Sequence, residues 1–175
     1  ISEEHGILFI VASGNDGRNS WNILGSPGDA KNALTVGATK LKVWDAMHYT
    51  SKGPKWLEYV KPEISCYSSL GTSFSAPIIT GLAARLLEQN PNATSAQLKS
   101  AIIRSGNLTT PNNYIGYGVP NSKKALLAIN GKQIEKSRVL SIGKSNYNLK
   151  LNEPSLYVVV YHKIGWEIIR KEVIR

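Results

Sequence analysis

The sequence of 175 residues lacks several features that define whole classes of protein. It contains one cysteine, Cys66, so no disulfide can form within the chain. No apolar run approaches the length of a membrane-spanning helix, and the first residues do not form a signal peptide. These absences exclude a disulfide-stabilised scaffold and indicate that the sequence holds no membrane span.

Acidic residues are also scarce. Twelve Asp and Glu residues stand against 21 Lys and Arg residues, for a formal net charge of +9. Residues 121–175 hold 11 basic and 4 acidic side chains, so this tail carries +7 of that charge. A basic polyanion-binding or adhesion module would use such a surface, and this is one hypothesis for function. Because no aromatic and basic recognition motif accompanies the tail, a solvated surface is favoured and no specific nucleic-acid partner is expected.

One stretch organises the rest of the chain. Residues 71–77 read Gly-Thr-Ser-Phe-Ser-Ala-Pro and lead into a nearly uncharged run that continues to Glu88. This run predicts a helix that is apolar on most sides and buried in the middle of a domain. Pro77 is tolerated in the first turn of a helix, which places Ser73 at or near the N-terminus, where free N–H groups favour negative charge. Alone, Ser73 would be interpreted as a helix cap.

A second stretch lies near the start of the chain. Residues 7–12 form a continuous apolar run, typical of a strand that is covered on both faces of a parallel sheet. The run continues through Ser13 and Gly14 to Asn15, Asp16 and Gly17, a pattern that alone indicates an ordinary turn.

Together the two stretches resemble, in the same order, two motifs of the subtilisin-like serine peptidases. The resemblance identifies Ser73 as the nucleophile and Asn15 as the side-chain donor to the oxyanion. It also implies that Ser13, Gly14, Gly71 and Thr72 shape the substrate-binding site. Weaker matches at residues 33–39, 49–54, 61–64 and 116–120 extend the resemblance over roughly residues 1 to 129. The function implied is peptide-bond hydrolysis by a serine endopeptidase acting on peptide or protein substrates.

The resemblance also implies a fold. Residues 1–130 are expected to be the C-terminal part of a subtilisin-like peptidase domain, an α/β fold with a partial doubly wound parallel sheet and flanking helices. Residues 131–175 contain four short β-prone runs, at 139–142, 146–151, 156–161 and 166–174, and predict a small antiparallel β-rich module. This module weakly resembles the C-terminal sorting domains of type IX secretion in Bacteroidetes-like bacteria, which implies a secreted or cell-surface bacterial protein.

The catalytic base is absent from the expected place. In the family the triad follows the order Asp, His, Ser along the chain, and only 14 residues precede Asn15 here. His5 and His48 do not match the family's histidine and are interpreted as a helix-end and a loop residue. The missing N-terminal half of the domain is therefore the expected partner, and this chain alone is expected to have little or no activity. Many family members bind calcium, so calcium is expected only in the intact domain; no cofactor or metal site is assigned in this chain.

The sequence departs from the family between Ile64 and Gly71. The family has a loop or hairpin of about a dozen residues or more before the nucleophile motif, whereas only residues 65–70 stand here. Part of the wall that faces the substrate is therefore expected to be missing. A non-catalytic peptide-binding protein, or a relic fragment of a subtilase, is the alternative hypothesis that follows from this departure and from the missing base.

Several local patterns predict structure directly. Thr94 and Gln97 form a capping box for a helix that ends at Ser105, and Asn121 is expected to cap a short helix that runs to Ile129. Cys66 is expected to be a small buried apolar side chain. The family has a cis proline near Pro27, so Pro27 is expected to be cis.

Overall fold

The computed structural model describes residues 4–42, 45–132, 134, 158–164 and 167–174. The chain forms two compact units, residues 1–139 and 140–175. The boundary expected after residue 130 stays a prediction, because most of residues 131–157 lie outside the described residues.

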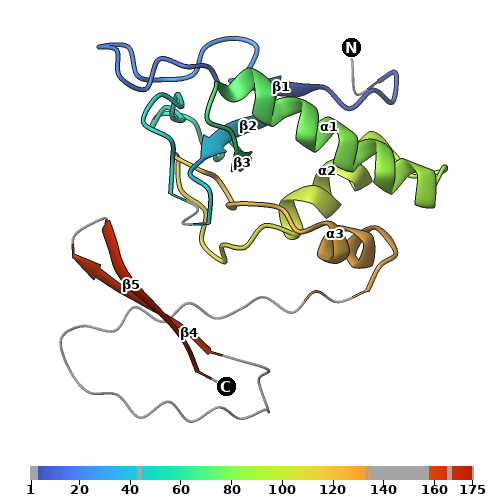
Figure 1. The fold of residues 1–175 in the computed structure, drawn as a ribbon. Helices are drawn as coiled ribbons and strands as arrows, with labels where there is room; N and C mark the ends of the chain where they lie inside the picture. Colours follow the sequence, from blue (N-terminus) through green and yellow to red (C-terminus); the bar gives the residue numbers. More distant parts are fainter. Residues whose placement is uncertain (1–3, 43–44, 133, 135–157, 165–166, 175) are drawn as a thin grey trace. The chain divides into compact units, whose positions relative to one another are not determined.

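The first unit is built on a parallel sheet of three strands in the order β1-β2-β3 (Figure 1). The strands are β1 (Ile10–Ala12), β2 (Leu34–Thr39) and β3 (Ile64–Tyr67). All six residues of the central strand β2 are buried, as expected for a parallel strand covered on both faces. The predicted α/β class, with a parallel sheet and flanking helices, is confirmed.

Strand β1 corrects one prediction. Residues 7–12 were expected to form a strand covered on both faces, but the strand spans only Ile10–Ala12 and its residues are half-buried. The side chains of Ile7 and Phe9 are 58% and 45% exposed. The reason is that β1 is an edge strand, which pairs with β2 alone in the described part of the chain.

Helix α1 (Thr72–Gln89) packs against all three strands and against two further helices (Figure 1). It was expected to be buried on most sides, and this is wrong for the described structure. One stripe is buried, formed by Thr72, Ser75, Ile79, Ala83 and Leu86. On the other side, Phe74 and Ile78 are more than half exposed, because the sheet and the helices contact α1 from one side only.

Pro77 also lies elsewhere than expected. The helix begins at Thr72, so Pro77 is its sixth residue and falls beyond the first turn. The hydrogen bond that Pro77 cannot make would run to the carbonyl oxygen four residues earlier, which is that of Ser73. Ser73 is nonetheless the second residue of the helix, so its predicted place at the N-terminus is confirmed.

The local patterns in the remaining helices are confirmed. Helix α2 (Ser95–Arg104) carries the complete capping box of Thr94 and Gln97. Helix α3 (Ser122–Ile129) is capped by Asn121, whose side chain accepts a hydrogen bond from the Lys124 N–H. The Ser26–Pro27 peptide bond is cis. No helix in the described part of the chain has both the length and the apolar character that a membrane crossing needs.

Cys66 lies on β3 inside the hydrophobic core and is 5% exposed. Its thiol donates a hydrogen bond to the Ser75 carbonyl oxygen at 3.3 Å, and the Ser75 hydroxyl returns one to the Cys66 carbonyl. Burial raises the pKa of the Cys66 thiol to about 11, so the thiol is neutral near pH 7. The prediction of a buried structural cysteine is confirmed.

The second unit contains an antiparallel pair of strands, β4 (Val158–Ile164) and β5 (Glu167–Ile174). This agrees with the expected antiparallel character of the β-rich module. The β-prone runs at 139–142 and 146–151 lie outside the described residues. The resemblance to sorting domains, and the secretion that it implies, stays a prediction.

Candidate active site at the N-terminus of α1

Ser73 is presented by a short connection between β3 and α1. Strand β3 ends at Tyr67 and the helix begins at Thr72, with Gly71 in the N-cap position. Gly71 has φ +145° and makes no side-chain cap, a conformation that favours glycine. Ser73 is exposed and does not cap the helix, so the interpretation of Ser73 as a simple helix cap is wrong.

Asn15 lies in the turn that follows β1. The turn begins at Gly14, whose φ is +97° and where a Cβ atom would lie 2.9 Å from the Ser51 hydroxyl oxygen. A residue with a side chain would be strained here and would crowd Ser51. The glycine therefore allows the chain to leave β1 sharply and to bring Asn15 over the start of α1.

Three hydrogen bonds join this turn to the first residue of α1. The Thr72 N–H donates to the Asn15 side-chain oxygen Oδ1 at 2.9 Å, and the Thr72 hydroxyl oxygen lies 3.1 Å from the same atom. The Gly14 N–H donates to the Thr72 hydroxyl oxygen at 3.1 Å. Three of the six predicted site residues, Gly14, Asn15 and Thr72, are thus joined by hydrogen bonds. Gly71 and Ser73 flank Thr72 in the chain. Although only residues 65–70 stand before the nucleophile motif, Asn15 still contacts the first residue of α1.

This arrangement leaves two N–H donors near the start of α1. Because Thr72 holds the amide oxygen of Asn15, the amide nitrogen Nδ2 is the group left to donate. On the helix, the Thr72 N–H is used by Asn15 and the Phe74 N–H by the Gly71 carbonyl oxygen. The Ser73 N–H between them meets no acceptor among the described residues. Two such donors at a helix N-terminus form an anion-binding arrangement.

Ser13 is placed differently from the other predicted residues. Its side chain is 2% exposed, and its hydroxyl oxygen lies 3.1 Å from that of Thr50. The Thr50 hydroxyl also accepts a hydrogen bond from the Ala38 N–H. The Ser13 hydroxyl is therefore buried in this internal network, and the expected part of Ser13 in shaping the substrate-binding site stays a prediction.

The turn at residues 49–51 supports the Asn15 turn, a role that sequence reasoning missed. The Ser51 hydroxyl accepts a hydrogen bond from the Asp16 N–H at 3.0 Å, and the Ser51 N–H donates to the Gly14 carbonyl at 2.9 Å. The available signal was the match of residues 49–54 to the family's Ser-x-Gly-Pro turn. That match did not indicate which loop the turn contacts.

Two histidines, His5 and His48, lie in the first unit with Ser73. His5 lies in an exposed turn, and His48 lies in a loop with its ring against that of Tyr49. Neither forms a hydrogen bond with Ser73. The interpretation of His48 as a loop residue is confirmed, whereas the helix end expected at His5 stays a prediction because residues 1–3 lie outside the described residues.

A buried ionic cluster lies where β2 and β3 begin. The Lys61 ammonium is fully buried and donates to the Ala33 carbonyl, the Thr35 hydroxyl and Glu63 Oε1 at 2.8, 3.1 and 2.9 Å. The Lys99 ammonium of α2 lies 3.0 Å from the same carboxylate oxygen. Burial lowers the pKa of Lys61, and the attraction of Glu63 opposes that shift. The cluster joins α2 to the sheet that positions the site.

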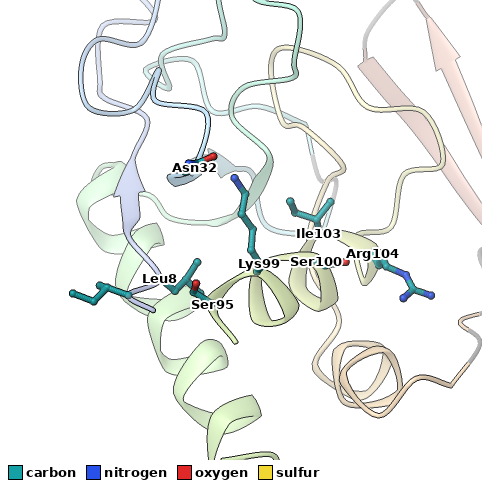
Figure 2. Close-up of a pocket in the computed structure, with 9 residues that line it drawn as sticks. Leu8, Asn32, Ser95, Lys99, Ser100, Ile103 and Arg104 are labelled. Atoms are coloured by element: carbon teal, nitrogen blue, oxygen red, sulfur yellow. The ribbon is translucent and has the colours of Figure 1, made fainter. Parts of the chain in front are cut away.

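A cavity of about 310 Å³ lies beside this cluster, against α2. Figure 2 shows Lys99 reaching from α2 toward the loop that carries Asn32. None of the six predicted site residues lines the cavity. Within the described ranges, no group of three or more His, Cys, Asp or Glu side chains is placed to hold a metal ion. Calcium binding by the intact domain stays a prediction.

Comparison with known proteins extends these observations. The subtilase family, Peptidase S8, matches residues 1–118. The chain is 31% identical over 148 residues to the subtilisin-like serine protease Rho m 2.0101 of Rhodotorula mucilaginosa, with 72% of this chain and 41% of that protein covered. It is 28% identical over 130 residues to subtilisin DY of Bacillus licheniformis, with 69% of this chain and 47% of that protein covered.

Solved structures show the same fold. The prenylagaramide maturation protease PagA superposes with a TM-score of 0.58 at 24% identity, over 75% of this chain and 53% of that chain. Sphericase superposes with a TM-score of 0.57 at 22% identity, over 68% and 49%. The chain thus spans about half or less of each of these relatives. Because the family match extends over residues 1–118 of 175, the chain belongs to the subtilase family of serine peptidases.

Proposed function

We propose that this chain carries the nucleophile and the oxyanion-binding residues of a subtilisin-like serine endopeptidase. The observation that supports the proposal is the pair of donors at the start of α1. Thr72 holds the Asn15 side chain by its amide oxygen, which leaves Asn15 Nδ2 to donate, and the Ser73 N–H follows Thr72 in the chain. Attack of the Ser73 hydroxyl on a peptide carbonyl would form a negative oxygen, and the proposal assigns these two donors to that oxygen.

The chemistry follows the general scheme of acyl transfer. A base removes the proton from the Ser73 hydroxyl as its oxygen bonds to the peptide carbonyl carbon, and the carbonyl oxygen becomes an oxyanion. Asn15 Nδ2 and the Ser73 N–H donate to that oxyanion. The C–N bond then breaks as the protonated base gives its proton to the departing amine. A water molecule, activated by the same base, hydrolyses the ester on Ser73.

The base and the carboxylate that orients it are proposed to come from a polypeptide segment outside this sequence. Two observations support this part of the proposal. Neither His5 nor His48 contacts Ser73, and the chain spans 41% to 47% of two relatives. The exposed apolar side chains of Phe9, Phe74 and Ile78 flank β1 and the start of α1 and form a surface that such a segment would cover.

Covalent labelling tests the proposal directly. The full-length protein is treated with a fluorophosphonate, digested, and analysed by mass spectrometry for the modified peptide. We expect one adduct, on Ser73, because only an activated serine reacts quickly with this reagent. Ser69 and Ser75 lie close in sequence and serve as internal controls. An unlabelled Ser73 in a protein that still retains peptides would contradict the proposal and favour the non-catalytic peptide-binding alternative.

Replacing Asn15 by alanine is expected to reduce turnover without preventing labelling. The size expected is that known for the oxyanion asparagine of subtilisin itself, a fall in kcat of about 10²–10³. KM should change little, because the donor acts mainly on the oxyanion of the transition state. The measurement is steady-state hydrolysis of a chromogenic peptide. Asn92→Ala, at an exposed asparagine in the turn between α1 and α2, is the matched control, and equal rates for the two variants would contradict the role of Asn15.

A further inference from the structure

Tyr49 forms a second connection between the two loops of the proposed site, in addition to the direct bonds of Gly14 and Asn15 to Thr72. Its hydroxyl donates a hydrogen bond to the Ser68 carbonyl oxygen at 2.6 Å. Its own carbonyl oxygen accepts a hydrogen bond from the Gly17 N–H at 2.8 Å. One end of Tyr49 therefore contacts the turn that leads to Ser73, and the other end contacts the turn that carries Asn15.

The turn that Tyr49 contacts is short and internally bonded. The Ser68 hydroxyl donates to the Gly71 carbonyl oxygen at 2.8 Å and accepts from the N–H groups of Leu70 and Gly71 at 3.3 Å. Ser68 is 5% exposed, so these bonds are shielded from water. Because residues 68–71 are held together in this way, a displacement of Ser68 is transmitted to the N-cap of α1 and hence to Ser73.

The turn that carries Asn15, residues 14–17, packs closely against residues 49–51. A Cβ atom on Gly17 would lie 2.5 Å from the Thr50 carbonyl oxygen and 2.8 Å from the Tyr49 carbonyl carbon. No larger residue fits this contact without movement of the backbone. The Asp16 N–H is held by the Ser51 hydroxyl on the same segment. The position of Asn15 is thus set against residues 49–51.

We propose that Tyr49 is a positioning residue, which sets the separation between the Asn15 amide and the Ser73 N–H through its hydrogen bond to Ser68. The inference rests on the proposed function and deepens it. Oxyanion donors act only when they lie at hydrogen-bond distance from the developing charge, and small displacements lower the rate steeply. Gly14 and Asn15 hold Thr72, and Cys66 holds Ser75. The bond from Tyr49 acts instead on the turn that precedes the helix, at Ser68.

The test compares two tyrosine-to-phenylalanine variants of the full-length protein. Tyr49→Phe removes the bond to Ser68. Tyr59→Phe is the matched control, because the half-buried Tyr59 hydroxyl donates to the Asp29 carbonyl at 2.8 Å outside the site. We expect Tyr49→Phe to lower kcat by about threefold to tenfold, the effect of one hydrogen bond, with KM unchanged and the same thermal midpoint as Tyr59→Phe.

A double-mutant cycle provides a second readout. Ser68→Ala removes the internal bonds of the turn, so the bond from Tyr49 no longer has a rigid element to hold. We expect Tyr49→Phe to have a smaller effect on kcat in the Ser68→Ala protein than in the wild type, since groups in one network are not additive. If the double variant lowers kcat by the product of the two single effects, Tyr49 does not act through Ser68.

The outcomes separate this inference from the proposed function. If the wild type reacts with the fluorophosphonate at Ser73 and Tyr49→Phe has the kcat of Tyr59→Phe, the role of Tyr49 is wrong and the function stands. If the kcat of Tyr49→Phe falls only in proportion to a lower thermal midpoint, the residue is merely structural. If wild-type Ser73 is neither labelled nor active, the proposed function is wrong and the role of Tyr49 falls with it.

Discussion

Replacing Ser73 by alanine in the full-length protein is expected to lower kcat for peptide hydrolysis by about 10⁶, the loss known for the nucleophile of subtilisin. The alanine variant keeps the N–H donor at position 73 and the side chain of Asn15, so it loses the covalent step and retains the oxyanion-binding groups. KM should stay close to the wild-type value. The measurement is steady-state hydrolysis of a chromogenic peptide, with circular dichroism to compare the folds of the two proteins.

Ser69→Ala is the matched control for this experiment. Ser69 is an exposed serine four residues before Ser73, in the turn that leads into α1. Its replacement should leave kcat within about twofold of the wild type, because surface changes of this kind are usually small. A Ser73→Ala variant that cleaves peptides at the wild-type rate would exclude Ser73 as the nucleophile. Slow residual cleavage would not, since oxyanion binding alone accelerates hydrolysis about 10³–10⁴-fold over water.

Replacing Glu63 by glutamine is expected to destabilise the folded protein by about 3–5 kcal/mol. The Glu63 carboxylate lies between two ammonium groups, those of Lys61 and Lys99, and its second oxygen accepts the Thr35 N–H at 2.8 Å. Glutamine removes the negative charge that Lys61 and Lys99 share. The two ammonium groups then lie close together without an anion between them. The free energy of unfolding, measured by urea denaturation of the full-length protein, tests the expectation.

Two further variants serve as comparisons for the stability loss of Glu63→Gln. Glu88→Gln breaks the Arg85–Glu88 pair, whose side chains are more than half exposed, and should change the free energy of unfolding by less than about 0.5 kcal/mol. Lys61→Met removes the buried cation instead, so Glu63 keeps Lys99 as its partner. It should cost less than Glu63→Gln. If Lys61→Met proves the more destabilising of the two, the charge balance assigned to the cluster is wrong.

The direction in which the free energy of unfolding changes with pH provides a further test of the cluster. Burial holds the pKa of Lys61 below its ordinary 10.5, and loss of Glu63 lowers it further. Between the folded pKa and 10.5, the unfolded chain binds more protons than the folded one, so stability rises with pH in this window. The difference in the free energy of unfolding between the wild type and Glu63→Gln should therefore become smaller as pH rises from about 7 toward 10. A deficit that grows over this range would contradict the assignment.

Much of the local structure could be predicted from the sequence alone. The capping box at Thr94 and the cap at Asn121 act within four residues of themselves, so their patterns are complete in the sequence. Ser73 at the start of a helix and Cys66 in the core follow equally from neighbouring residues. The family also follows from two short motifs, because each is long and ordered enough to be distinctive.

Predictions of burial were wrong for helix α1 and strand β1, because the burial of an element depends on which other elements pack against it. The apolar run from residue 78 to 87 predicts a buried helix, yet one side of α1 is exposed, because burial depends on which elements pack there. The run at residues 7–12 predicts a covered strand, yet β1 lies at a sheet edge. Strand β3 was not predicted, because its four residues, Ile64–Tyr67, form a run too short to show the alternation of a strand.

The sequence by itself determined the family and the three helices, and it predicts which residues form the site. The tertiary structure alone decided how those residues meet. Asn15 and Thr72 are 57 residues apart, and their hydrogen bonds exist because β1 and α1 pack on the same sheet. The contacts of Tyr49 with two separate turns arise in the same way. Such contacts have no local pattern, since they depend on the packing of the whole sheet rather than on the residues nearby.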